Sequence, residues 1–409
     1  MKDFQLYQQI LGLVKPWSVK NVTLKPSERE VEVEVVCTET VWGCPVCGQR
    51  AHVHEWERRR WRHLDSCQFK TVLVAEVPRV QCAEHGSQFV AVPWAEKYSR
   101  FTRLFERFAI DVLIACSTSA ACELLRISWD EADGIKQRAV KRGLASKPVR
   151  VNKDLCVDEK SAARGQEYVT VVARVEGEET VVDFAGPGRK EESLDAYWQA
   201  LTPAQLAGIE AVAMDMWAPF VRSTLAHVPK AAEKIVFDPY HMMQHMNQAV
   251  NAVRLAEHRE LTAQGDDTLA GTRWLWLYGQ ENIPEKQRPV FDALKVANLR
   301  TARAWGLKET LRQLWWYKSE AWAEKHFQRW YSWAVRSRLE PVKEVARMLK
   351  PRLPNILTYC KSRLSNGPLE GLNNKIQGLV KKAYGYRNVQ RFINDIYFHC
   401  GGLDLYPAQ

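Results

Sequence analysis

Alternating apolar and polar residues mark the first part of the chain. In Val31-Glu32-Val33-Glu34-Val35 every second residue is apolar, which is the period of a strand with one buried face. The pattern predicts a small β-rich module over residues 1–95, after which the period changes.

Beyond this module the apolar positions follow the period of a helix. A short second helix is predicted over residues 120–126. Ser128, with Glu131 three residues later, forms a capping box that opens a further helix. Short helices joined by a tight turn favour a helix-turn-helix domain over residues 96–150, although plain helical packing gives the same period. The apolar positions of the first helix are Leu104, Phe105, Phe108, Ala109, Val112 and Leu113.

Between residues 151 and 241, short strands arrive before any helix and then alternate with helices. Three strands in succession are followed by helix, strand, helix and strand. This is the order of a ribonuclease H-like core, in which right-handed crossovers lead to parallel strands on the far side of the first strand. The predicted strands are 155–157, 168–174, 180–184, 211–214 and 234–237, and the predicted helices are 191–201 and 219–225.

Composition adds information on size, location and partners. A chain of 409 residues, 46% of them hydrophobic, is long enough for about two to four domains. No apolar run approaches the roughly 20 residues of a membrane span, and the N-terminal sequence lacks a signal-peptide pattern. We therefore expect a cytoplasmic protein without membrane association. The net charge of +10 suggests a polyanionic partner, or else only a solvated basic surface.

Two paired ligand spacings stand out among the ten cysteines and ten histidines. Cys44 pairs with Cys47, and Cys82 pairs with His85; a glycine follows each pair. Two such knuckles can close a tetrahedral zinc site, and reduced thiols suit a chain without an export signal. We predict a zinc ion in the N-terminal module, the alternative being unrelated thiols.

Two groups of basic residues are candidates for contact with DNA phosphates. One is a run around Trp61 between the two knuckles, which a solvated hairpin would also explain. The other lies toward the far end of the helix that Ser128 opens. The first group is Arg58, Arg59, Arg60 and Arg62, and the second is Lys136, Arg138, Lys141 and Arg142.

Three aspartates, Asp158, Asp215 and Asp238, follow predicted strands. If the first and fourth strands are neighbours, Asp158 and Asp215 lie roughly 4.8 Å apart, close enough to share two magnesium ions about 4 Å apart. Asp238 would lie one strand further out, about 10 Å from Asp158. Pro239 after it fits a helix start, so a capping role is expected for Asp238. Glu159 should point to the opposite face of its strand and is not expected to bind the metal.

A third metal ligand must come from elsewhere in the chain, and Glu370 is the candidate. Pro368 predicts a helix start. An acid followed by amide and cationic groups on one helix face suits a metal at one end and phosphate further along, although an ordinary amphipathic surface helix shows the same spacing. The residues that share this face are Glu370, Asn374, Gln377 and Lys381.

Taken in order, several motifs resemble the DDE transposases of bacterial insertion sequences, and the ISL3 family in particular. Behind the two knuckles come Val157-Asp158-Glu159-Lys160, Met214-Asp215-Met216-Trp217, Asp238-Pro239-Tyr240-His241, Pro368-Leu369-Glu370-Gly371 and Gly385-Tyr386-Arg387-Asn388. The resemblance covers nearly the whole chain, and the ordered set is far more specific than any single motif. One departure is His85, where a fourth cysteine is expected, but histidine is an acceptable zinc ligand.

The resemblance implies a site, a reaction and partners. Asp158, Asp215 and Glu370 become the triad that binds Mg²⁺ or Mn²⁺, and His241 becomes a secondary catalytic candidate near the transferred strand. The implied activity is cleavage at the ends of the element and strand transfer, acting on terminal inverted repeats and target double-stranded DNA. A homodimer bound to the nucleoid is implied. Expected DNA contacts in the C-terminal part are Asn374, Lys381, Lys382 and Arg387.

The resemblance also implies an all-α insertion, residues 242–356, between Asp215 and Glu370. The insertion holds eight of the sixteen tryptophans. Most are expected in a helical core, with at most one or two stacking on an unpaired base. The catalytic core is then split into residues 151–241 and residues 357–409. The whole chain is expected to be a multidomain α/β protein, with a zinc-ribbon-like module and a helix-turn-helix in front.

Two other functions compete with this interpretation. A structure-specific nuclease would share the ribonuclease H-like core and would prefer branched DNA to a defined terminal sequence. A non-enzymatic DNA-binding regulator derived from a transposase would keep the fold without cutting DNA, although the complete carboxylate set argues against it. Cleavage of an element's ends in the presence of magnesium separates both alternatives from a transposase.

Overall fold

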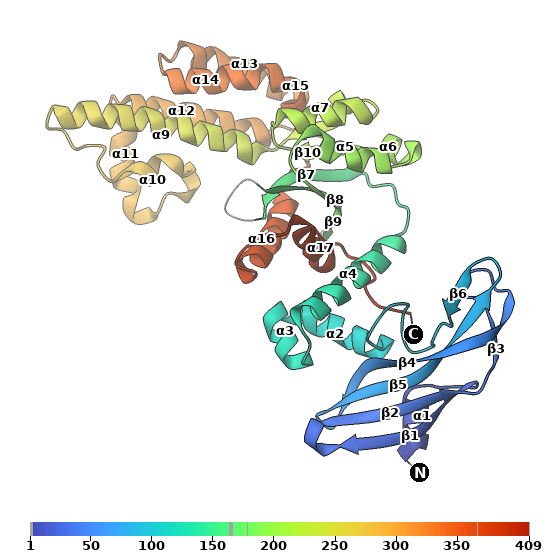
Figure 1. The fold of residues 1–409 in the computed structure, drawn as a ribbon. Helices are drawn as coiled ribbons and strands as arrows, with labels where there is room; N and C mark the ends of the chain where they lie inside the picture. The colour runs from blue at the N-terminus through green and yellow to red at the C-terminus, as the bar shows by residue number, and fades with distance from the viewer. Residues whose placement is uncertain (1–2, 163–166, 178, 366, 409) are drawn as a thin grey trace. The chain divides into compact units, whose positions relative to one another are not determined.

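The chain folds into two separately packed units (Figure 1). The computed structural model describes residues 3–162, 167–177, 179–365 and 367–408. The first unit comprises Met1–Lys147 and Leu403–Gln409, and the second comprises Pro148–Gly402. The predicted zinc module and helix-turn-helix therefore share one unit, and the predicted core and its insertion form the other.

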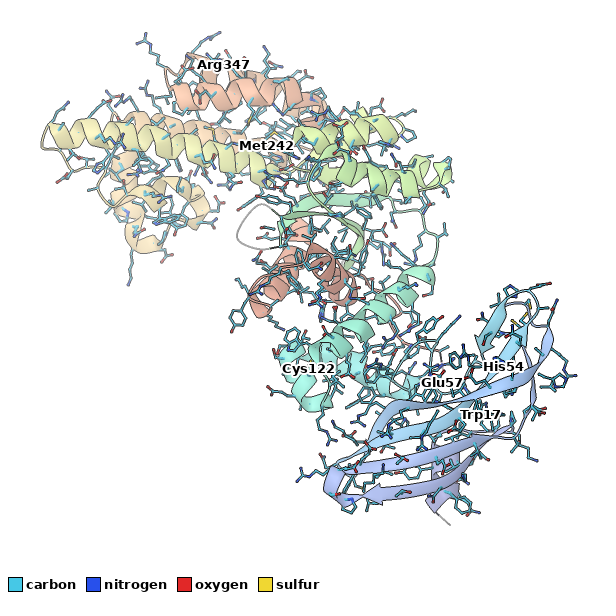
Figure 2. The ribbon with its side chains drawn as sticks, viewed as in Figure 1. Trp17, His54, Glu57, Cys122, Met242 and Arg347 are labelled. Carbon is cyan, nitrogen blue, oxygen red and sulfur yellow. The ribbon has the colours of Figure 1, made fainter. Side chains whose placement is uncertain are left out.

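A mixed sheet of long strands forms much of the first unit. Its order is β1-β2-β5-β4-β3, with β6 paired to β5. The predicted alternation is confirmed, because Val33 and Val35 of β2 are fully buried. They pack in one core with Trp17, which Figure 2 labels, and Trp61. The elements are α1 (Asp3–Ile10), β1 (Trp17–Lys25), a 3-10 turn (Pro26–Glu28), β2 (Glu30–Cys37), β3 (Val41–Gly43), β4 (Arg50–Ser66), β5 (Phe69–Cys82) and β6 (Gly86–Phe89).

The basic run of β4 has partners within this sheet. Arg60 donates to Glu30 at 2.7 Å and to Glu32 at 3.0 Å. Arg58 lies 3.5 Å from the same Glu32 carboxylate. An ion-paired sheet face accounts for these arginines, and contact with DNA would require them to exchange partners. The other members are also engaged: Arg62 pairs with Asp65, and Arg59 lies over the ring of Trp61.

The helical segment folds as the predicted helix-turn-helix. The helices are α2 (Arg103–Ala115), α3 (Thr118–Leu125) and α4 (Trp129–Ala145). Ser128 caps α4 and forms the predicted capping box with Glu131. Arg126, in the left-handed conformation, ends α3. The residues from Arg126 to Ser128 therefore make the tight turn between the two helices.

Most of the basic residues predicted on α4 have partners inside the first unit. Arg138 Nε donates to the buried Glu106 of α2 at 2.8 Å. Arg142 Nη1 lies 2.7 Å from Glu96, and Lys136 is only 5% exposed. Lys141 is the exposed member of the group. Arg138 thus joins α4 to α2, and Arg142 joins α4 to the segment before α2. A count of basic residues in the sequence cannot distinguish such ion pairs from a DNA-binding surface.

The last residues of the chain pack on the helix-turn-helix. Arg142 Nη2 donates to the carbonyl of Leu405 at 2.9 Å, and Leu405 itself is buried. Two further hydrogen bonds run from Arg107 to the Pro407 carbonyl at 3.0 Å and from the Tyr406 hydroxyl to Asp111 at 2.6 Å. The N-terminal unit is therefore completed by the C-terminal residues.

The sheet of the second unit has the strand order that the sequence predicts. Its strands run β11-β10-β7-β8-β9. An antiparallel meander, β7-β8-β9, is extended beside β7 by the parallel strands β10 and β11, which is the ribonuclease H-like arrangement. The elements are β7 (Asp154–Ser161), β8 (Tyr168–Glu176), β9 (Glu179–Pro187), α5 (Glu191–Ala200), α6 (Pro203–Gly208), β10 (Ala211–Met214), α7 (Ala218–His227), α8 (Ala231–Lys234) and β11 (Ile235–Phe237).

The predicted insertion is helical, and its buried side chains belong to the same hydrophobic core as those of the sheet. Met242, labelled on α9 in Figure 2, lies in the same buried cluster as Leu155 of β7. This shared core joins the insertion to the sheet. The helices are α9 (Pro239–Ala263), α10 (Arg273–Leu277), α11 (Arg288–Val296), α12 (Arg300–Arg312), α13 (Glu320–Arg336), α14 (Glu340–Leu349) and α15 (Leu353–Ser362), with 3-10 turns at Gln280–Asn282, Glu285–Gln287, Gln313–Trp316 and Lys350–Arg352.

The expectation that most tryptophans of the insertion lie in its core is wrong. Trp276, Trp305 and Trp330 are buried, and Trp315 is half-buried. A tryptophan in a helical sequence carries no signal of whether a neighbouring helix covers it, so the sequence could not separate the two groups. The exposed members are Trp274, Trp316, Trp322 and Trp333.

The chain returns to the sheet through α16 (Gly367–Lys382) and α17 (Val389–Cys400). The Tyr397 hydroxyl on α17 accepts a hydrogen bond from the backbone N–H of Ala185 on β9 at 2.8 Å. Asn388 caps α17, and Gly385 adopts a φ of +88° in the turn before it. Across the described residues, no helix is both long and apolar enough to cross a membrane.

Candidate active site and zinc site

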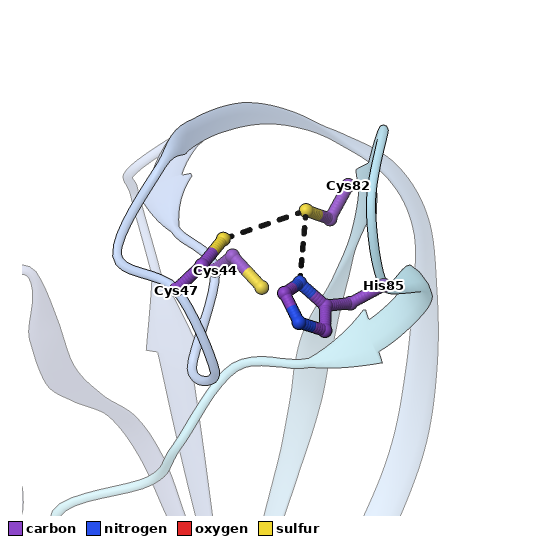
Figure 3. A group of neighbouring side chains, drawn as sticks. All are labelled: Cys44, Cys47, Cys82 and His85. Atoms are coloured by element: carbon purple, nitrogen blue, oxygen red, sulfur yellow. Dashed lines mark hydrogen bonds between the residues drawn. The ribbon is translucent and has the colours of Figure 1, made fainter.

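The four predicted zinc ligands meet in one cluster (Figure 3). Cys44 and Cys47 lie between β3 and β4, and Cys82 and His85 lie where β5 turns into β6. Their ligand atoms all lie within 4.8 Å of one another. The sulfurs of Cys47 and Cys82 are 3.7 Å apart, and Cys82 Sγ is 3.6 Å from His85 Nδ1.

This spacing fits a tetrahedral zinc ion. Zn–S bonds of roughly 2.3 Å place the sulfurs of a tetrahedron about 3.8 Å apart. Gly48 and Gly86 adopt φ angles of +76° and +64°, a conformation that glycine reaches without a steric penalty, and they close the two knuckles. A zinc ion held here ties the β3–β4 turn to the β5–β6 turn.

Asp158 lies within β7, not at its end as the sequence suggested. Pairing with β8 continues past Asp158, which lies opposite Val171. On the other side, the described pairing with β10 ends at Cys156 and Ala213. Asp158 and Asp215 are each two residues beyond that last pair, so both aspartates follow the paired parts of β7 and β10. β7 continues past Asp158 because its antiparallel partner β8 extends further than its parallel partner β10.

Three hydrogen bonds hold the Asp158 carboxylate. Its Oδ1 accepts from the backbone N–H of Glu159 at 2.8 Å. Its Oδ2 accepts from Lys160 Nζ at 2.7 Å and from Asn373 Nδ2 at 2.8 Å. Asn373 belongs to α16, one turn after Glu370, so this bond brings the Glu370 helix to the sheet.

Asp215 is electrostatically linked to Asp158 and to α9. Burial raises the pKa of the Asp215 carboxyl, and the negative charge of Asp158 raises it further. The backbone N–H of Trp217, which donates to Asp215 Oδ1 at 2.9 Å, and positive charge on His241 or His245 oppose this rise. His241 Nε2 lies 3.8 Å from the carboxylate of Asp238, which follows β11, and His245 lies one turn further along α9.

Glu370 lies in the first turn of α16 with an exposed side chain. The face predicted from its spacing is also exposed, at Asn374, Gln377 and Lys381, and so are Lys382 and Arg387. Among the described residues, the N-terminal cluster is the one group of three or more acidic, histidine or cysteine side chains placed so that it could hold a metal ion. Asp158, Asp215 and Glu370 do not form such a group in this structure.

The two excluded acids have other partners. Asp238 caps α9 and accepts from the backbone N–H of Tyr240 at 3.3 Å, which confirms the expected capping role. Glu159 forms an ion pair with Arg189 at 3.3 Å. Burial raises the pKa of the Glu159 carboxyl, and the charges of Asp215 and Asp158 add to the rise, so Glu159 borders the site.

Sequence reasoning missed three residues of this site. Lys160 could have been found by strand alternation, because it shares a face of β7 with Asp158. His245 follows His241 at a spacing of four residues on a helix and so lies on the same face. Asn373 gave no such signal, because the helix face predicted from the spacing after Glu370 contained its neighbour Asn374 instead.

A ribonuclease H-like core, joined to a zinc-binding module and a helix-turn-helix, is the architecture of a DNA transposase. Residues 155–396 match the family model for the ISL3 transposase DDE domain. Residues 40–85 match the zinc finger of the IS204, IS1001, IS1096 and IS1165 transposases, and residues 90–140 match the helix-turn-helix domain of the ISL3 transposases. The chain belongs to the ISL3 transposase family.

Curated relatives agree with this assignment along almost the whole chain. The transposase for insertion sequence element IS1001 of Bordetella parapertussis is 27% identical over 369 residues, which cover 89% of this chain and 90% of that protein. The transposase for insertion sequence element IS1557 of Mycobacterium tuberculosis is 27% identical over 431 aligned positions, covering 96% of this chain and 94% of that protein. The predicted family, fold class and zinc ribbon are confirmed.

Proposed function

We propose that this transposase binds the terminal inverted repeats of an insertion sequence, cuts at their ends and joins the freed 3′-hydroxyls to target DNA. Asp158, Asp215 and Glu370 are the proposed ligands of Mg²⁺ or Mn²⁺. The observation that carries the proposal is the hydrogen bond from Asn373 to Asp158, which joins the Glu370 helix to the end of the sheet where Asp215 also lies.

The donor set fits a hard divalent cation. Carboxylate and amide oxygens are the ligands that magnesium and manganese prefer. Within the described structure, Asn373 Oδ1 is buried and has no hydrogen-bond partner, so it offers a further oxygen beside Asp158. Burial is the main cause of the raised pKa of Asp215, and the negative charge of Asp158 adds to it; a cation would relieve the repulsion between the two carboxylates. When bound, a pair of such cations activates an oxygen nucleophile and stabilises the leaving oxygen.

The protein's own groups orient the DNA around these carboxylates. The Lys160 ammonium, which contacts Asp158 at 2.7 Å, is placed to meet a phosphate at the same carboxylate. His241 is the proposed group that accepts or donates a proton at the reacting oxygens. Water or a DNA 3′-hydroxyl is the attacking group, so no covalent bond to the protein forms, unlike the reaction of a serine or tyrosine recombinase.

DNA binding is assigned to exposed cations and amides of both units. On α4 the assignment rests on Lys141, since its basic neighbours have partners inside the unit. In the second unit it rests on Asn374, Lys381, Lys382 and Arg387. A homodimer that holds one element end per subunit completes the proposal, because transposition requires two ends to be joined to one target.

The test uses purified full-length protein and the DNA that flanks its gene. With Mg²⁺ we expect binding to short inverted repeats in that DNA and strand breaks at their outer ends that leave 3′-hydroxyl groups. EDTA should stop the breaks and leave the binding. Preferential cutting of branched DNA without regard to the repeats would instead identify a structure-specific nuclease, and binding without cutting would identify a regulator.

Loss of the Asn373 side chain should weaken the binding of Mg²⁺ at the proposed active site. Replacing a residue that orients a metal ligand typically costs about 10- to 100-fold in metal affinity or activity. We therefore expect Asn373→Ala to raise the Mg²⁺ concentration for half-maximal end cleavage by about 10-fold or more. Asn374→Ala, next to it on the exposed face, should leave that concentration unchanged, and equal shifts in the two variants would contradict the role of Asn373.

A further inference from the structure

The turn between β9 and α5 presents the side chain of Arg189. Two hydrogen bonds fix this turn to β8: the backbone N–H of Gly188 donates to the carbonyl of Tyr168 at 2.7 Å, and the Thr170 hydroxyl donates to the carbonyl of Gly188 at 2.8 Å. Gly188 adopts a φ of +85°, and a Cβ there would lie 2.7 Å from Ser193 Oγ. The backbone before Arg189 is therefore held in a conformation that favours glycine.

Two aromatic rings hold the guanidinium of Arg189. Its Cζ atom lies 4.0 Å from the ring centroid of Tyr168 and 5.5 Å from that of Trp217. The indole N–H of Trp217 also donates to the backbone carbonyl of Arg189 at 3.1 Å. A guanidinium stacks well on aromatic faces, and a side chain ordered in this way loses less freedom when it binds a ligand. Arg189 is thus oriented before a ligand arrives.

The guanidinium uses only part of its hydrogen-bonding capacity within the protein. Nη1 lies 3.3 Å from a carboxylate oxygen of Glu159, whereas Nε and Nη2 have no hydrogen-bond partner among the described residues. The side chain is 41% exposed, and neither of these two nitrogens is a buried atom. Adjacent N–H groups of arginine form a planar fork that matches two oxygens of a phosphate. Arg189 therefore presents an open phosphate-binding edge.

The two neighbours of this guanidinium also hold the proposed metal ligands. The side chain of Glu159 pairs with Arg189, and its backbone N–H donates to Asp158 Oδ1 at 2.8 Å. The ring of Trp217 contacts Arg189, and its backbone N–H donates to Asp215 Oδ1 at 2.9 Å. Successive side chains of a strand point to opposite faces, so Arg189 follows Glu159 and lies beside the carboxylate site without being part of the metal shell.

We propose that Arg189 anchors a phosphate of the DNA strand that is held at Asp158 and Asp215. Its Nε and Nη2 donate to two oxygens of a phosphodiester next to the scissile one. The scissile phosphate itself meets the metal ligands and Lys160, which contacts Asp158 from the same face of β7. A second fixed phosphate sets the direction of the strand through the site, since a single contact leaves the strand free to pivot. The proposal rests on the proposed function, because it names a contact to the DNA bound there.

The test is a phosphate scan with full-length protein and duplexes of the flanking DNA. Each duplex carries one methylphosphonate, in which a methyl group replaces a charged phosphate oxygen, at one position near the repeat end. Single-turnover end cleavage with Mg²⁺ is measured at saturating protein. For the wild type we expect a position next to the cleavage site where the substitution slows cleavage by roughly 10- to 100-fold, the contribution of a hydrogen bond to a charged group.

Arg189→Ala should slow the cleavage of unmodified DNA by a similar factor and should lose its sensitivity at that position alone. The protein change and the DNA change remove the same contact, so together they should cost no more than either one. At the other sensitive positions, including the scissile phosphate, a methylphosphonate should slow the wild type and the variant equally. Arg189→Lys keeps the charge without the planar fork and should regain only part of the rate.

Arg222→Ala is the matched control. Arg222, on α7, also pairs with a carboxylate, that of Glu191 at 2.7 Å, and its side chain is 60% exposed. Its loss should leave both the cleavage rate and the pattern of sensitive phosphates unchanged. The melting temperature of each variant shows that it is folded, and Arg189→Gln, which keeps a planar polar group against the two rings, gives the same comparison if Arg189→Ala is unstable.

A double variant separates contact with DNA from charge balance inside the protein. If Arg189 only neutralises Glu159, then Glu159→Gln removes the need for it, and Glu159→Gln/Arg189→Ala should cut as fast as Glu159→Gln alone. We expect instead that the double variant keeps the slow cleavage of Arg189→Ala and remains insensitive at the same phosphate.

Equal sensitivity of the wild type and Arg189→Ala at every phosphate would overturn the proposal, and so would full recovery of the rate in the double variant. Both results are read with wild-type protein that cuts the ends of the repeats, so they leave the proposed function intact. A wild-type protein that binds no repeat or cuts none would contradict the proposed function, and the phosphate anchor with it.

Discussion

Replacing Asp158 or Asp215 with asparagine, or Glu370 with glutamine, is expected to abolish cleavage of the element's ends while leaving DNA binding intact. Each change removes one negative charge and keeps the shape of the side chain. Changes in the outer partners of metal ligands already cost about 10- to 100-fold, so loss of a ligand itself should cost at least about 100-fold. End cleavage with Mg²⁺ and a mobility-shift assay on the same DNA measure the two effects.

Asp238→Asn is the matched control, because Asp238 also follows a strand of this sheet but caps α9. An asparagine retains the capping oxygen, so the free energy of unfolding should change by less than about 1 kcal/mol and cleavage should persist. Substantial cleavage by any one of the three ligand variants would remove that residue from the site. A folded but inactive Asp238→Asn variant would show that Asp238, whose carboxylate lies 3.8 Å from His241 Nε2, belongs to the site.

Replacing Cys82 with serine should release the zinc ion and unfold the N-terminal module. Structural zinc contributes about 10–16 kcal/mol of binding free energy in small zinc-dependent folds, and here the ion joins two turns of one sheet. In this larger unit we expect a fall in the melting temperature on the order of 10 °C or more, since each kcal/mol is worth about 2–4 °C at this size. Metal analysis should give one zinc per wild-type chain and none in the variant.

Two other substitutions test the assignment of the ligands. Cys67→Ser alters an exposed thiol outside the cluster, so zinc content and melting temperature should stay at wild-type values. His85→Cys keeps a zinc ligand at the same position and should retain the ion. Full zinc content in Cys82→Ser would show that the cluster is not the metal site.

Much of the fold could be predicted because its signals are local. The alternation around Val33 and the capping box at Ser128 each depend on a few neighbouring residues, and both are confirmed. The strand order of the second unit followed from the succession of strands and helices together with the handedness of crossovers. That order placed Asp158 on β7 and Asp215 directly after the adjacent strand β10.

What escaped prediction depends on partners that are distant in the sequence. Asn373 contacts Asp158 across 215 positions of the chain, and its neighbour Asn374 has the same residue type. Arg138 looks like a DNA contact until its buried partner Glu106 is seen. The exposure of Trp316 is equally hidden, because it depends on which helices pass nearby and not on its own neighbours.

The packing of residues 403–409 on the helix-turn-helix affects the order in which the first unit can fold during synthesis. Arg142 donates to the carbonyl of Leu405, which the ribosome adds only after the second unit. While synthesis continues, the emerging helix-turn-helix lacks its final packing partner, and the whole second unit must be translated before that partner exists. The helix-turn-helix therefore depends on residues that are translated after the whole second unit, so a product of translation interrupted within that unit lacks the packing of Arg142 on Leu405.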